Sequence, residues 1–134
     1  MDFSAARLAI RTLFATAWGN LTEIAWPDVP FDIPDNQAWV RVDIKHNMGY
    51  QASMGSPGSN RFRREGIVTV QVFAPEGKGA NDAADKADAV ADIFIGTDDN
   101  GIHYYDTTIN EVGNDESGFY QINVVTKFRY DRLS

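Results

Sequence analysis

The first twenty residues place apolar side chains at the spacing of a helix. These positions are Phe3, Ala6, Ile10, Leu13, Phe14 and Ala17. Steps of three and four residues put all of them on one helical face. Gly19 follows the last of them, and glycine often ends a helix because it adopts positive φ at little steric cost. The pattern therefore predicts an amphipathic opening helix that ends near Trp18–Asn20.

Five later segments carry the alternation or the β-branched composition that is typical of strands. They are Thr22–Trp26, Ala38–Lys45, Gly66–Phe73, Ile102–Val112 and Phe119–Tyr130. A second helix is predicted to run to Phe94 from Asn81 or Asp82, because either side chain can cap the first turn. Its apolar stripe consists mostly of alanine. Small side chains let the helix axis lie close to a sheet.

The order of these elements, α-β-β-β-α-β-β, predicts an α+β fold. We expect a mostly antiparallel sheet of about four to five strands with two helices packed on one face. The last two strands are separated by a short turn-rich segment, so they are expected to form a hairpin. A chain of 134 residues is most simply one domain, 1–134.

Two connections between the predicted strands are unusual. Pro27, Pro30 and Pro34 favour an extended, irregular segment over a helix or a central strand. Residues 46–60 contain three glycines, three serines and a proline. This composition predicts a long hairpin loop around 46–63, and loops of such length tend to be functional or mobile.

The predicted loop combines flexible backbone with residue types that often make protein contacts. Its contact candidates are Met48, Tyr50, Met54, Arg61, Arg63 and Arg64. We interpret this set as a partner-contact region, because methionine, tyrosine and arginine are common at interfaces. The alternative interpretation is a mobile hairpin with solvated charges.

Trp39 and Arg41 lie on the polar face of the strand predicted at 38–45. A tryptophan is unusual among polar neighbours. It either covers the rim of the sheet or takes part in an interface. We include Trp39 and Arg41 among the candidates for contact with a subunit or another partner.

The net charge of −7 conceals a separation of the two signs. Residues 45–65 carry Lys45 and three arginines against one glutamate, a local charge of +3. Residues 74–117 carry eleven acids against two lysines, a local charge of −9. An acidic surface disfavours tight binding of nucleic acid, since proteins that hold it neutralise phosphates with lysine and arginine. The plainer interpretation is that the acids only keep the protein soluble.

The sequence contains no recognisable catalytic or metal-binding pattern. It has no cysteine and two isolated histidines, and it lacks the glycine patterns of phosphate loops and nucleophile elbows. The middle of a calcium loop is matched by Asp98, Asn100 and Gly101. The positions of its first and last ligands are occupied by Gly96 and Thr107, which cannot serve as those ligands. We therefore expect no enzyme activity, no metal and no cofactor. No apolar run approaches the ~20 residues of a membrane helix, so we expect a cytosolic protein.

Taken in order, several segments resemble the tail terminator-like proteins of long-tailed bacteriophages and prophages. They are Ala9–Trp18, Ile24–Phe31, Trp39–Val42, the arginine-rich hairpin before Gly66, Val70–Pro75 leading into an Ala/Asp helix, Gly118–Val124 and Phe128–Asp131. The resemblance covers nearly the whole chain. Its motifs are structural, so its specificity rests on their order.

The resemblance implies a structural protein of the virion, made in the host cytoplasm and located at the head-proximal end of the tail. Six copies are expected to close into a ring that caps the tail tube, ends its polymerisation and supports head–tail joining. The implied partners are further copies of the chain, the tube protein and a connector protein. DNA would pass through the channel without specific binding, past the acids Asp82, Asp85, Asp88 and Asp92.

A ring also needs surfaces that join its subunits. Strand edges at Trp39–Lys45 and along the closing strand are expected to be exposed and available for pairing between copies. The basic hairpin would face a neighbouring subunit or the rim of the tube.

Two other functions fit parts of the sequence. The protein could be a different neck component, a head-completion or tail-completion protein of similar size. It could instead be a small cytosolic enzyme or ligand-binding domain. A monomer in solution with a deep pocket that holds His103, Tyr104 and Asp106 would favour that function.

Overall fold

The structure is a computed structural model that describes residues 1–77, 80–114 and 118–134. Two helices and six strands follow one another along the chain. They are α1 (Phe3–Trp18), β1 (Glu23–Ala25), β2 (Trp39–Gln51), β3 (Arg61–Pro75), α2 (Asn81–Phe94), β4 (Asp98–Asp99), β5 (Ile102–Asn114) and β6 (Phe119–Leu133).

The strands form one curved sheet in the order β1-β2-β3-β6-β5-β4. All neighbours are antiparallel except β1, which runs parallel to β2. The α+β class is confirmed, whereas the predicted number of strands is too low. The missing strand is β4, a pair of residues too short to show any periodicity. The turn that joins it to β5 is Asn100-Gly101, both at positive φ, as a tight hairpin requires.

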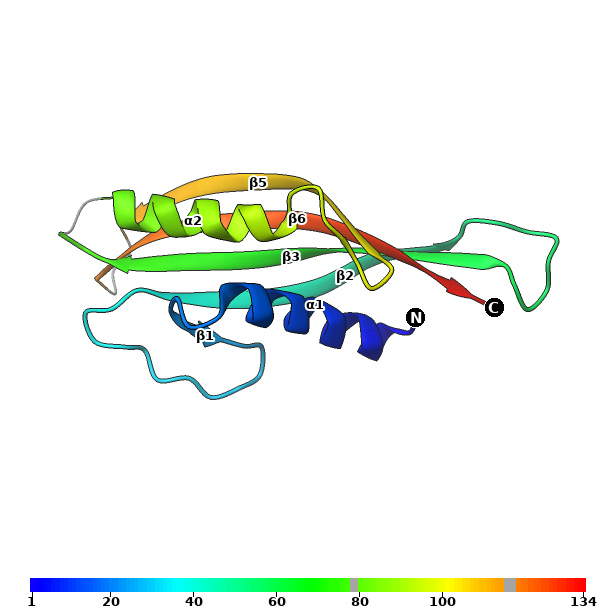
Figure 1. Ribbon diagram of the computed structural model, residues 1–134, viewed down its shortest axis with the longest axis horizontal. Helices are drawn as coiled ribbons and strands as arrows, with labels where there is room; N and C mark the ends of the chain where they lie inside the picture. Colours follow the sequence, from blue (N-terminus) through cyan, green and yellow to red (C-terminus); the bar gives the residue numbers. More distant parts are fainter. Residues whose placement is uncertain (78–79, 115–117) are drawn as a thin grey trace.

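Both helices lie on one face of the sheet, as the sequence predicts (Figure 1). The side chain of Asp2 caps α1 by accepting a hydrogen bond from the amide of Ala5 at 2.8 Å. α1 ends at Gly19, which has a φ of 61°. The core fills the space between helices and sheet, and Phe14 stacks on both Trp18 and Phe94 there. Burial of these apolar faces accounts for the layered arrangement.

The helix-free face carries a second, smaller apolar cluster at one end. It consists of Ala25, Trp39, Phe73 and Phe119, with Phe31 packed against it. The side chain of Trp39 therefore lies on the face opposite the helices, as the alternation predicts, but it is only 3% exposed. The proline-rich segment supplies Phe31, which covers the tryptophan ring at a centroid distance of 5.2 Å.

The loop predicted around 46–63 is mostly strand, which corrects the sequence analysis. β2 continues to Gln51 and β3 begins at Arg61, so the connection is limited to residues 52–60. A bulge between His46 and Met48 lets β2 continue past an irregular position. We call residues 47–64, together with the end of β6 at 130–133 that pairs with them, the arm. Figure 1 shows the arm extending beyond both helices.

The prediction that the closing strand has an exposed edge is wrong. β6 lies between β3 and β5, and its pairing with β3 extends from Phe119 to Leu133. At the other expected edge, β1 covers Trp39–Arg41. The long strands β2 and β5 therefore lie near the two sides of the sheet, each next to a very short strand.

Candidate interaction surface

Two of the four arginines in the arm, Arg61 and Arg63, form hydrogen bonds with one carboxylate on β6. Arg63 donates two hydrogen bonds to Asp131, from Nε at 2.8 Å and from Nη2 at 3.2 Å. Arg61 adds a third at 3.1 Å from Nη1. These hydrogen bonds, that of Arg63 foremost, hold the pKa of Asp131 below its usual value. The arm is therefore a three-stranded ribbon in which Asp131 on β6 braces two arginines on β3.

Arg64 lies at the base of the arm, near His46 and Tyr130. The Nε2 atom of His46 is 2.7 Å from the hydroxyl of Tyr130. The imidazole also packs between Phe3 and Phe128, at centroid distances of 4.5 and 5.1 Å. Burial lowers the pKa of His46, and the positive charges of Arg7 and Arg64 lower it further. This junction joins the arm to α1 and to the body of the sheet.

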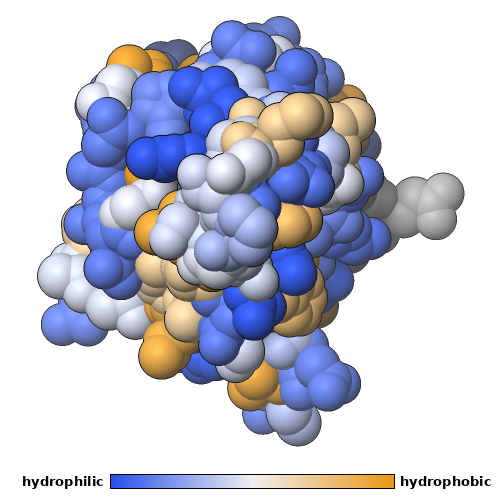
Figure 2. Space-filling view, turned by 90° about the vertical axis from the view of Figure 1, so that its right-hand side faces the viewer, coloured by the Kyte–Doolittle hydropathy of each residue, from blue (hydrophilic) through white to orange (hydrophobic). Residues whose placement is uncertain are grey.

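The arm presents apolar side chains to solvent. Met48 is 57% exposed, Tyr50 44% and Met54 87%. Leu133, at the end of β6, is 60% exposed. Figure 2, which views the molecule from the end that carries the arm, shows separate hydrophobic patches among hydrophilic groups. The arm thus brings together every loop residue that the sequence predicts for contact.

Trp39 and Arg41 lie apart from that group, in the body of the sheet. Trp39 stacks on Phe73 at a centroid distance of 4.2 Å and is buried. The exposed guanidinium of Arg41 lies 5.3 Å from the centroid of the Trp39 ring. The tryptophan thus forms part of a covered cluster, and Arg41 is the member of the pair that meets solvent.

The four predicted channel acids follow one side of α2. Asp82 forms an ion pair with Lys86 at 2.6 Å, whereas Asp85, Asp88 and Asp92 are exposed. α2 lies over the body of the sheet and the arm extends from the opposite end (Figure 1). The molecule therefore separates its acidic and basic groups in space as well as in sequence.

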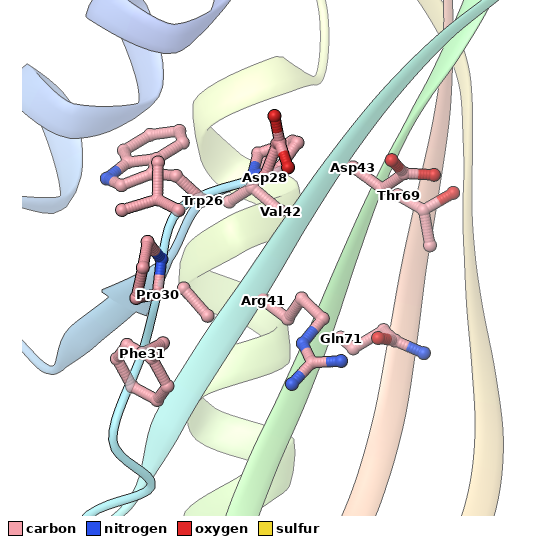
Figure 3. Close-up of a pocket in the computed structure, with 12 residues that line it drawn as sticks. Trp26, Asp28, Pro30, Phe31, Arg41, Val42, Asp43, Thr69 and Gln71 are labelled. Atoms are coloured by element: carbon pink, nitrogen blue, oxygen red, sulfur yellow. The ribbon is translucent and has the colours of Figure 1, made fainter.

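A hollow of about 710 Å³ lies between the proline-rich segment and the strands β2 and β3. Figure 3 shows Trp26, Pro30 and Phe31 on one side of it and Arg41 and Gln71 on the other. Within the described ranges, no group of three or more histidine and acidic side chains gathers where it could hold a metal ion.

The three residues whose shared pocket would favour an enzyme or ligand-binding function point in different directions. His103 contacts Asp98 at the side of the sheet. Tyr104, the next residue, is buried against Phe94 on the opposite face, and burial raises the pKa of its phenol. Asp106 is exposed, 3.6 Å from Lys127. The three side chains do not share a pocket.

Sequence reasoning missed three residues that shape the arm. Asp131 braces the arginines, and His46 and Tyr130 form the junction at its base. Asp131 is distant from the arginines in sequence, and only the register of β3 against β6 brings them together. No local pattern in the sequence signals that contact.

Comparison with known proteins gives one family. The family model described as phage tail terminator protein matches residues 5–110. Sixteen solved chains match the structure. One of them has a TM-score of 0.65 at 17% identity and covers 100% of this chain and 96% of its own length. At that identity it supports the fold alone. No curated protein matches the sequence.

The part of the chain that the structure describes contains no helix suited to span a membrane. Neither α1 nor α2 has the length and apolar character needed to cross a bilayer.

Proposed function

This chain belongs to the phage tail terminator family, a family of structural tail proteins, and from this we propose that it caps the tail tube as a hexameric ring. The ring would end polymerisation of the tube and provide the surface for head–tail joining. The observation that carries the proposal is the family match over residues 5–110, which includes α2 and β1 to β4 completely and all but the first two residues of α1.

A ring of identical subunits needs two different surfaces on each copy. A head-to-tail contact that closes by rotation gives a ring, whereas one that does not close gives a filament. The chain has distinct features at its two ends, the basic arm and the acidic α2. Such asymmetry suits a head-to-tail arrangement.

We propose that the arm makes the contact with a neighbouring subunit or with the rim of the tube. Its exposed Met48, Tyr50 and Met54 offer apolar surface, and its arginines offer positive charge. Arg41 would extend this contact along the body of the sheet. Trp39 would act from beneath the surface, by keeping the strand that carries Arg41 in place.

The exposed acids of α2 are proposed to face the central channel. Carboxylates repel phosphate, so a channel lined by them would let DNA slide without adhering. The candidates are Asp82, Asp85, Asp88 and Asp92. A cryo-electron microscopy map of the ring on a tail would test this directly, because α2 on the outer surface of the ring would remove the assignment.

The proposed function is tested by adding the purified protein to tubes of the cognate tube protein while they grow. We expect a ring at one end of each tube and an arrest of elongation, because the capped end can no longer accept a subunit. Bovine serum albumin at equal concentration controls for non-specific effects. Continued elongation with no added density at the tube ends would refute the proposal.

A further inference from the structure

Two stretches of strand edge are uncovered, on opposite sides of the sheet. β1 pairs with β2 only at Trp39–Arg41, and within the described ranges no other strand lies on that side of β2. On the opposite side, β4 pairs only with Ile102 and His103 of β5. Most of β2 and most of β5 therefore have unpaired peptide groups along one side.

The uncovered edge of β2 is open mainly in the arm. The guanidinium of Arg7 donates a hydrogen bond to the carbonyl of Ile44 at 2.7 Å and so occupies the edge near the body. That bond also shows that the backbone carbonyl and amide of Ile44 point away from β3. Ile44 lies opposite Val68, and Gly49 lies opposite Arg64, four residues earlier on β3. Backbone N–H and C=O groups alternate in direction along a strand, so residues four apart on β3 face the same side. The N–H and C=O of Gly49 therefore also point away from β3.

The same reasoning identifies the open groups of β5. The amide of Tyr104 donates to the carbonyl of Thr97 at 3.1 Å, so it points away from β6. Tyr104 lies opposite Phe128, and Ile109 lies opposite Val124, four residues earlier on β6. The amide of Ile109 therefore points to the uncovered side as well. The irregularities at Tyr105/Thr108 and Glu111/Gly113 bound this open stretch.

Direction and charge make these two edges complementary. β2 and β5 run in opposite directions, because three antiparallel steps separate them in the sheet. A copy turned about an axis parallel to the strands would therefore bring its β5 antiparallel to β2. The arm contains four arginines and one acid, Asp131, whereas residues 98–114 contain four acids and no lysine or arginine.

We propose that the edge of β2 at Met48–Gln51 pairs with the edge of β5 near Thr107–Glu111 of the next copy of this chain. Because the contact joins unlike surfaces, a rotation that closes after a whole number of copies gives a ring with a sheet continuous between subunits. This inference rests on the proposed ring and specifies how its subunits meet. The bulges restrict pairing to short stretches, which protects the long edges from unlimited association.

The short length of the paired stretch also limits the strength of the contact between subunits. A stretch of four or five residues forms few hydrogen bonds, each with a net contribution of about 1 kcal/mol. Free copies are therefore expected to associate weakly. A tube that binds several copies side by side raises their effective concentration and drives the ring to close.

Proline substitutions test the pairing, because proline removes an amide hydrogen and is tolerated on edge strands. Gly49→Pro blocks the β2 edge and Ile109→Pro blocks the β5 edge, and neither removes a bond to the inner neighbour. Gly49→Ala and Ile109→Ala change the same positions but keep the amides. We expect each proline variant to occupy tube ends as rings at least ten-fold less often than its alanine counterpart. Circular dichroism and thermal unfolding verify that each variant is folded.

Mixing the two proline variants separates head-to-tail pairing from other arrangements. Each variant retains one intact edge, so a 1:1 mixture is expected to form dimers on analytical ultracentrifugation at high concentration. Neither variant alone should dimerise, and the mixture should not close into rings. Dimers of Gly49→Pro alone would show pairing between two β5 edges and overturn the inference.

Disulfide cross-linking offers a second test that does not depend on proline, since the chain has no cysteine. Met48→Cys or Tyr50→Cys is mixed with Thr108→Cys or Asn110→Cys and oxidised in the presence of tubes. At least one combination should give mixed dimers, and Asp88→Cys on α2 serves as the unpaired control.

The outcomes distinguish the inference from the function on which it rests. Wild-type protein that forms no ring on tubes would contradict the proposed function itself. Rings that form equally well from wild type and both proline variants would overturn only the strand pairing.

Discussion

At the scale of single residues, Gly66 is the position with the least room for a side chain. A Cβ atom there would lie 2.2 Å from the carbonyl oxygen of Lys45 and 2.6 Å from Cζ of Phe128. Its backbone is not in the positive-φ region, so the demand is for space and not for an unusual conformation. The glycine lets β3 pass beneath the Phe128 ring where the arm begins.

Gly66→Ala is therefore expected to destabilise the protein by about 3 kcal/mol, the upper range for overpacking in a core. Gly49→Ala is the matched control, because its Cβ would meet its nearest neighbours at 3.8 Å. The control should change the free energy of unfolding by less than about 0.5 kcal/mol. Urea denaturation of both variants measures the difference. Equal stabilities would show that the contact at Gly66 relaxes freely.

His46 is expected to make stability depend on pH. Its pKa is lowered in the folded protein, so the unfolded chain binds a proton more readily than the folded one near the ordinary pKa of 6.5. Protons therefore favour unfolding, and stability falls as pH drops from above 6.5 toward the folded pKa. The melting temperature should decrease over this range.

His46→Gln removes the titrating group and keeps a side chain that can hydrogen-bond with Tyr130. Thermal unfolding of wild type and variant between pH 8 and pH 5 should show a steeper loss for wild type. Parallel curves would mean that the histidine does not contribute to the pH dependence.

At the scale of elements, the sequence predicted best what depends on local pattern. Both helices were predicted with boundaries close to those observed, because their stripes and their ends at Gly19 and Phe94 are encoded within a few residues. The extent of the arm was not predictable in this way. Residues 47–51 and 61–64 look like loop, and they are held as strand by pairing with each other and with the distant end of β6.

Other misses have the same cause. The alternation in β6 identifies a strand but not its neighbours, so its central place in the sheet was missed. The alternation in β2 placed Trp39 on the correct face, but no local signal showed that Phe31 would cover it. Of the candidate surface, the contact residues of the arm could be named from the sequence. The brace by Asp131 could not.

The role of the arm as a charged contact can be separated from its rigidity. Replacing Arg61, Arg63 and Arg64 with glutamine removes three positive charges and also breaks the pairing with Asp131. We expect attachment to tubes to fall at least ten-fold, because the partner loses its ionic contacts. Co-sedimentation with tubes at low and at high salt measures the loss.

Asp131→Asn is the matched control for that variant. It weakens the same ion pairs, at a cost of about 1 kcal/mol in stability, but keeps all three arginines. Attachment that is retained in Asp131→Asn and lost in the triple variant supports a contact through charge. Equal losses of attachment in both variants would mean that attachment depends on the rigidity of the arm and not on its charge.

At the scale of the whole molecule, the protein carries its distinct surfaces on separate parts of one sheet. The arm extends from one end of the sheet, the acidic α2 covers its body, and two open strand edges lie on its opposite sides. These surfaces suit a subunit that meets copies of itself and a tube. Family membership places it in the phage tail.

The central claim, that this protein ends tail growth, is tested most directly by the lengths of tails assembled without it. Electron microscopy of particles from a host in which its gene is inactivated, with the gene supplied in trans as control, gives that distribution. We expect tube lengths to vary widely and heads to remain unattached, since nothing caps the tube or joins it. Tails of normal, uniform length attached to heads would contradict the account.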